Sequence, residues 1–169
     1  MKKVLQYSGV ISALLAIVAI VLALATPAMR YTGLLSETLI PGTTALFGET
    51  TTVLGKVVIV YKPSALALIG WILALAGVIV VLCGVILPLL KVKGIKKFAG
   101  IMNLFAVVVL VLAGVFMFLV VPTFAAANFD GHTDGLAMGA GWVIAAILAI
   151  AAGAFAILPA AVDFLGKKK

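Results

Sequence analysis

The sequence predicts a membrane all-α fold: a bundle of four transmembrane helices with a small extracellular β-sheet formed by the first outer loop. Three observations lead to this prediction: an apolar composition, four long uncharged stretches, and lysine clusters beside them. Of the 169 residues, 66% are hydrophobic and only 10% are charged. A soluble domain is usually nearer half apolar and a quarter charged, so this composition indicates a lipid environment.

Four stretches without Asp, Glu, Lys or Arg are long enough to cross a bilayer. A helix needs about 20 apolar residues to span ~30 Å of hydrocarbon. We therefore expect one domain, residues 1–169, with an outer β-rich loop at 26–63 and a short outer loop at 122–135. The four predicted spans lie at about 8–25, 64–90, 98–121 and 136–161.

The basic residues predict the orientation of the chain in a cell membrane. Nine of them lie before span 1, between spans 2 and 3, or after span 4, and only Arg30, Lys56 and Lys62 lie in the other two loops. The positive-inside rule then places both termini and the middle loop in the cytoplasm. The net charge of +7 gathers beside apolar runs, so we expect the lipid bilayer as partner and no nucleic acid.

Span 4 carries small residues at every fourth position. At 3.6 residues per turn, they form one nearly straight groove along which a second helix backbone can approach closely. We expect this helix-packing face to lie inside the chain's own bundle, with a subunit interface as the alternative. The residues are Ala137, Gly141, Ala145, Ala149 and Gly153.

Spans 2 and 4 share a pattern that indicates an internal duplication. Gly70-Trp71 and Gly141-Trp142 are each followed, at identical spacing, by Ile-Leu-Pro. The alternative is shared membrane composition, because Trp at the outer edge of a span is common.

The first outer loop has the composition of β-structure. We expect extended chain at 30–40, a turn at Pro41-Gly42, a short strand at 43–47, a turn at Gly48-Glu49, and extended chain again at 50–61 with Gly55 as a bulge. Short strands bury little by themselves, so this sheet should rest on the helix ends; alternatively, the uncharged run 38–48 dips into the membrane. Candidate residues for the contact with the helix ends or with a neighbouring molecule are Leu46, Phe47, Val53 and Leu54.

The sequence shows no set of residues suited to catalysis. The spans contain no ionisable group at mid-membrane depth, which proton relays and ion-coupled carriers require. Cys83 is the only cysteine and His132 the only histidine. Residues 130–135 resemble half of a calcium loop but lack the bidentate glutamate, so they predict a polar turn. We therefore expect no enzyme activity, no cofactor and no metal.

The layout resembles that of the claudin and peripheral-myelin-type tetraspan superfamily, whose members have four spans, cytoplasmic termini and a β-rich first outer loop. The local similarity covers about 25 residues, from Gly135 to Leu158, where a Gly-Trp precedes an Ala- and Gly-rich helix. The family's first loop carries a Trp, a Gly-Leu-Trp and two cysteines. Here Gly33-Leu34-Leu35 is the nearest fragment and the loop has neither Trp nor Cys, so no site residue is carried over.

Three functional hypotheses follow. The first is a non-enzymatic structural protein that self-associates, or contacts a neighbour, through its outer β-rich loop and its small-residue helix faces. The second is an accessory subunit of a larger membrane transporter or channel complex that docks through span 4. The third is an oligomeric pore. Either a homo-oligomer or another membrane protein is therefore the expected partner.

Overall fold

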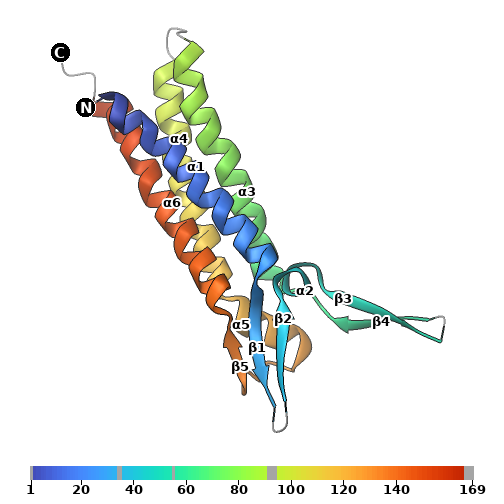
Figure 1. Cartoon of the computed structure of the whole chain (residues 1–169). Coiled ribbons are helices and arrows are strands. Elements are labelled where there is room, and N and C mark those ends of the chain that lie inside the picture. The colour runs from blue at the N-terminus through green and yellow to red at the C-terminus, as the bar shows by residue number, and fades with distance from the viewer. Residues whose placement is uncertain (1, 34–35, 55, 91–94, 166–169) are drawn as a thin grey trace.

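The computed structural model describes residues 2–33, 36–54, 56–90 and 95–165, and its main feature is a bundle of four long helices. They are α1 (Lys2–Ala25), α3 (Ala65–Ile86), α4 (Ile95–Phe118) and α6 (Ala140–Leu165). Each contains an apolar segment of at least 19 residues, so the prediction of four helices long enough to cross a membrane is confirmed. The start of α1 and the end of α6 lie at one end of the bundle, and the strands lie at the other, the sheet end (Figure 1). Lys91, Lys93 and the three C-terminal lysines lie outside the described residues.

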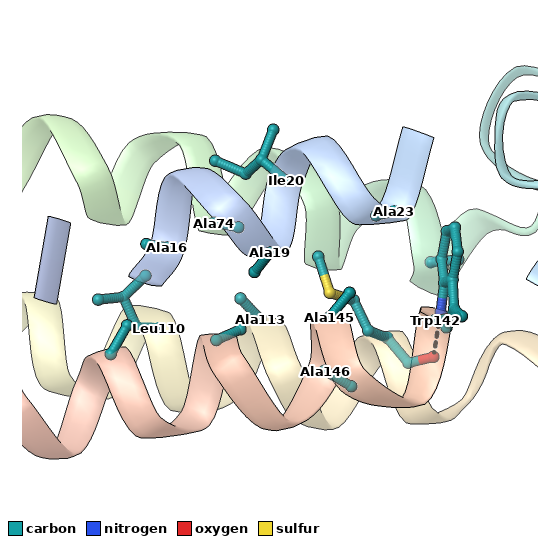
Figure 2. Close-up of a cluster of buried hydrophobic side chains, with 14 of the residues drawn as sticks. Ala16, Ala19, Ile20, Ala23, Ala74, Leu110, Ala113, Trp142, Ala145 and Ala146 are labelled. Atoms are coloured by element: carbon teal, nitrogen blue, oxygen red, sulfur yellow. Dashed lines mark hydrogen bonds between the residues drawn. The ribbon is translucent and has the colours of Figure 1, made fainter. Parts of the chain in front are cut away.

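Each helix of the bundle packs mainly against two neighbours: α1 against α3 and α6, and α4 against the same two. The core between them is rich in alanine. Ala16, Ala19, Ala74, Ala113 and Ala145 are all fully buried, and Figure 2 shows their side chains pointing into the space between the helices. Small side chains allow the backbones to approach closely, which is how helices gain van der Waals contact in a membrane.

Glycine recurs at every seventh residue of α3, and each of these glycines faces α4. A Cβ atom at any of them would collide with α4: with backbone atoms at Gly70, and with the side chains that fill the space at Gly77 and Gly84. A seven-residue repeat is the spacing at which two helices stay in register along a left-handed crossing. The glycines and the residues they face are Gly70 with Ala113 and Met117, Gly77 with Leu110, and Gly84 with Asn103.

The three-stranded antiparallel sheet at the sheet end includes a strand from residues 122–139, not from the first loop alone as expected. Its strand order is β2 (Glu37–Pro41), β1 (Pro27–Thr32) and β5 (Leu136–Met138). Strand β1 pairs with both neighbours, and Ala137 lies opposite Arg30. The expectation that Ala137 belongs to the helical stripe is therefore wrong, because this residue is in β5.

Helix α6 begins at Ala140, four residues later than predicted, because the chain first completes the edge of β1. The Thr32 N–H donates to the Gly135 carbonyl at 2.8 Å, and the Gly139 N–H donates to the Ala28 carbonyl at 2.8 Å. These bonds satisfy backbone groups that would otherwise lack partners. Gly135 has a φ of +76°, a backbone conformation that favours glycine, and this residue ends the preceding turn.

The predicted strand at 43–47 is a short helix, α2 (Gly42–Phe47). Pro41 ends β2 and precedes the helix, with no turn between them, and Gly48 ends it with a φ of +76°. Ala45 is fully buried at the sheet end, and its carbonyl accepts from the Ser64 N–H at 2.8 Å. Burial against α1 and α3 therefore overrides the β-propensity of the two threonines in this segment.

The first half of the predicted outer loop at 122–135 is helical. Helix α4 ends at Phe118, Leu119 interrupts the helical geometry, and α5 (Val120–Asn128) follows. Pro122 cannot donate a backbone hydrogen bond, so it is tolerated in the first turn of a new helix but not in the interior of a continuous one. The remaining residues of the segment form a polar turn, with Asp130 at a φ of +50° and Gly131 at +85°.

The two Gly-Trp positions of the suspected duplication differ in their surroundings. Trp142 is fully buried, and its Nε1 donates to the Met117 carbonyl at 2.9 Å (Figure 2). Trp71 is half-buried and stacks edge-on against Phe47. Pro159 lies inside α6, whereas Pro88 lies in the short 3-10 helix η1 (Leu87–Leu90) that follows α3.

Candidate interaction site: the projecting hairpin

The β3–β4 hairpin projects from the sheet end, away from the bundle and from the three-stranded sheet (Figure 1). Strands β3 (Glu49–Val53) and β4 (Lys56–Tyr61) pair antiparallel, and no other described strand pairs with either of them. The register sets Thr50 opposite Ile59 and Val53 opposite Lys56, with an irregularity at the base near Glu49. Gly55, the expected bulge, lies outside the described residues.

Large apolar side chains of this hairpin are exposed. Leu54 at the tip is 99% exposed and Val53 beside it is 52% exposed. On β4, Val58 and Val60 are 46% and 43% exposed. Leu54 also has a φ of +51°, a conformation that large L-residues adopt rarely and at some cost. The tip therefore holds a leucine outward in strained backbone, away from the chain's own core.

The four candidate residues of the first loop fall in two different places. Leu46 is fully buried in α2, so it belongs to the contact between the loop and the helix ends. Phe47 is 56% exposed, but its ring lies 5.7 Å from the ring of Trp71. Only Val53 and Leu54 lie on the projecting hairpin. These two residues are therefore free to meet another molecule, and Leu46 is not.

Asn128, the last residue of α5, fixes the base of the hairpin through its side chain. Its Oδ1 accepts from the Lys62 N–H at 2.7 Å, and its Nδ2 donates to the Lys62 carbonyl at 3.0 Å. The same Nδ2 lies 3.1 Å from the Phe124 carbonyl. One amide thereby satisfies both backbone groups of the residue that follows β4, much as a neighbouring strand would.

An aromatic cluster surrounds the same base. The ring of Tyr61, the last residue of β4, lies 5.6 Å from Phe124 and 6.5 Å from Phe129. Phe129 also stacks on Tyr31 of β1 with a centroid distance of 5.8 Å. Aromatic pairs at these separations add about 0.5–1.5 kcal/mol each beyond the area that they bury. The cluster ties the hairpin, α5 and the three-stranded sheet together.

The helix α3 starts from this same region. The Ser64 and Thr123 hydroxyl groups are hydrogen-bonded to each other, which joins the start of α3 to α5. Gly48 lies against the other side of the hairpin base, where an added Cβ would come within 2.7 Å of the Tyr61 carbonyl oxygen. The two ends of the hairpin therefore leave the folded body at adjacent points.

The remaining small residues of the α6 stripe face other helices or the end of α1. A Cβ at Gly141 would collide with Thr26, and one at Gly153 would lie 2.9 Å from a methyl group of Val111 in α4. Ala145 and Ala149 are fully buried. This face of α6 is therefore occupied within the single chain.

The few His, Cys, Asp and Glu side chains of the described residues lie apart from one another. No group of three His, Cys, Asp or Glu side chains among them is close enough to hold a metal ion. His132 is exposed in the polar turn, and Cys83 is a free, half-buried thiol in α3. Asn103 is fully buried against Gly84, and within the described part of the chain its amide atoms have no hydrogen-bond partner.

The residues of α5 that hold the hairpin base were not predicted from the sequence. Phe124 and Asn128 lie four residues apart on one face of α5. That spacing would have been informative if the segment had been interpreted as a helix. The partners that they contact, Tyr61 and Lys62, are more than 60 residues away in the sequence, and nothing local indicates this contact.

Comparison with models of known protein families found no match, and a search of curated protein sequences found none either.

Proposed function

We propose that this protein is a non-enzymatic, multi-pass protein of the cell membrane that self-associates through its β3–β4 hairpin. The observation that carries the proposal is the hairpin itself: apolar side chains of its tip and of strand β4 are exposed, and its base is held by Asn128 and the aromatic cluster. The likeness to the claudin and peripheral-myelin-type superfamily remains a proposal that rests on the sequence layout.

Placement in the membrane is supported by the four apolar helices together with the lysine distribution. Lys2 and Lys3 begin α1, and Lys96 and Lys97 lie in the first turn of α4, at the bundle end opposite the strands. Under the positive-inside rule this end is cytoplasmic, and the sheet end with the hairpin is extracellular. The exposed leucines, isoleucines and phenylalanines along the helices would then face lipid.

Self-association is supported by the physical state of the hairpin. An isolated two-stranded hairpin is only marginally stable in water, and an exposed apolar edge strand readily pairs with another chain. The anchor formed by Asn128 and the aromatic cluster fixes the base of this hairpin, so little ordering is needed when a partner binds. A projecting hairpin that is held at its base and exposes an apolar strand is suited to contact between molecules.

The other two hypotheses have less support. An accessory subunit was expected to dock through the small-residue face of α6, but Ala145, Ala149 and Gly153 are covered by other helices of the same chain. An oligomeric pore would need a polar surface facing a neighbouring copy, and the described helices present mainly apolar side chains outward.

The test is the mass of the protein purified in mild detergent, by light scattering, for the native chain and for V53T/L54N. Asparagine tolerates the backbone conformation at position 54, so this change removes apolar surface without adding strain. We expect an oligomer for the native chain and a monomer for the variant. The matched control L39S removes a leucine that is 54% exposed on β2 and should leave the mass unchanged.

Two results would contradict the proposal. A native protein that is monomeric both in concentrated detergent solution and in lipid vesicles would exclude self-association, and a stoichiometric foreign protein in the preparation would favour the accessory-subunit hypothesis.

A further inference from the structure

The two strands of the hairpin differ sharply in polarity. Strand β3 reads Glu-Thr-Thr-Thr-Val, whereas residues 57–60 of β4 form an unbroken apolar run, Val-Val-Ile-Val. A continuous apolar run is typical of a strand that is covered on both faces and lies inside a sheet. Here β4 is instead an edge strand, because β3 is its only described neighbour, and Val58 and Val60 are almost half exposed.

We propose that β4 pairs antiparallel with β4 of a second copy, giving a four-stranded sheet in the order β3-β4-β4-β3. This inference rests on the proposed self-association and names its partner and geometry. The apolar strands then lie in the middle of the sheet, and the threonine-rich strands form its outer edges. The contact is two-fold symmetric and therefore closes at a dimer.

The lysines at the two ends of β4 select the register. In an antiparallel pair, a two-fold axis requires one residue of β4 to lie opposite the same residue of the second copy. Val58 opposite Val58 meets this condition and sets Lys56 opposite Val60. The next symmetric register, with Ile59 opposite Ile59, places Lys56 opposite Lys62, and like charges directly opposite each other destabilise a sheet. A shift of one residue instead sets Val58 opposite Ile59, which turns one copy face over and removes the two-fold symmetry.

The bundle excludes the main alternative, in which β4 pairs antiparallel with β3 of the next copy. That arrangement sets the hairpin bases of neighbouring copies side by side. Each copy contributes two strands, so the bases lie only about 10 Å apart, which is twice the distance between paired strands. Helices pack 8–10 Å apart, so a four-helix bundle is roughly 20 Å wide and two bundles would overlap. In the β4–β4 pair, each base lies beside the other copy's tip, so the bundles stand at opposite ends of the sheet.

The contact is small for a stable dimer. Stable interfaces in solution usually bury more than about 1,000 Å² in total, and one strand edge of six residues offers less. We therefore expect the dimer to dissociate on dilution in detergent. Confinement of both copies to one bilayer raises their effective concentration and favours pairing.

The test is disulfide trapping in lipid vesicles, in a C83A background that removes the only native thiol. Copies that carry V58C are reconstituted and oxidised gently. We expect a linked dimer, because position 58 lies opposite position 58 of the second copy in this register. I59C alone should link at least tenfold less, because position 59 lies opposite position 57 of the second copy. T51C alone, on the outer edge, should not link.

The possible outcomes separate this inference from the proposed function. Stronger linkage of I59C than of V58C would show a shifted register, and linkage of an E49C copy to a K62C copy would show head-to-tail pairing; either result overturns the inference alone. An oligomeric mass without any β4 linkage also overturns it alone. A monomer in both detergent and vesicles would overturn the proposed function as well.

Discussion

Replacing Asn128 with alanine should release the hairpin from the folded body while leaving the helices intact. The change removes both bonds to the Lys62 backbone and the contact with the Phe124 carbonyl. A net intramolecular hydrogen bond contributes about 0.5–1.5 kcal/mol. Lys62 is exposed and water can replace part of the loss, so we estimate a cost of about 2 kcal/mol for the three interactions.

The assay is amide hydrogen exchange of the protein in nanodiscs. Because 1.4 kcal/mol corresponds to a factor of ten, 2 kcal/mol predicts roughly 25-fold faster exchange for Lys62 and for the paired amides of β3 and β4. The matched variant N128D keeps the oxygen that accepts from Lys62 N–H and loses the donor, so its exchange rates should be intermediate. Unchanged exchange in N128A, or an equal increase in all four long helices, would refute the anchoring role.

Three further predictions concern the bundle, each checked by thermal unfolding in detergent. G77L should lower the Tm, because Leu110 fills the space at that glycine and overpacking typically costs about 1–3 kcal/mol; the control I79L, at a position 63% exposed, should not change it. N103L should raise the Tm, because it replaces a buried amide without partners by an apolar side chain of similar size; a clear decrease would show that the amide has a structural partner. S12A should lower the Tm slightly, by the equivalent of about 0.6 kcal/mol, because Ser12 Oγ donates to the Ala152 carbonyl at 2.6 Å; an unchanged Tm would show that this bond contributes nothing.

The long helices could be predicted from sequence because their signal is local. An unbroken apolar run gives the length of a span directly, and α1 and α3 match the predicted positions closely. The packing of α6 was partly predictable for the same reason, since the spacing of Ala145, Ala149 and Gly153 defines one helix face. The heptad of Gly70, Gly77 and Gly84 was equally visible in the sequence and was overlooked.

The sheet end could not be predicted in the same way, because it depends on contacts between distant residues. Strand β5 exists because the edge of β1 offers unpaired backbone groups, and nothing within residues 136–138 indicates this pairing. Helix α2 contains β-branched residues yet is helical, because burial of Ala45 and Leu46 outweighs their local preference. The anchor at Asn128 likewise joins residues 66 positions apart.

The central claim is that copies of this protein associate in a membrane through the hairpin. Fluorescence resonance energy transfer between labelled copies in lipid vesicles tests this claim most directly. Gly48 and Tyr61 are adjacent, so residues 49–61 can be replaced by a short Gly-Ser connector that leaves Lys62 and the bundle in place. We predict strong energy transfer between donor- and acceptor-labelled copies of the native chain, falling to the random-collision level without the hairpin. Equal transfer with and without the hairpin, or none in the native protein, would contradict the account.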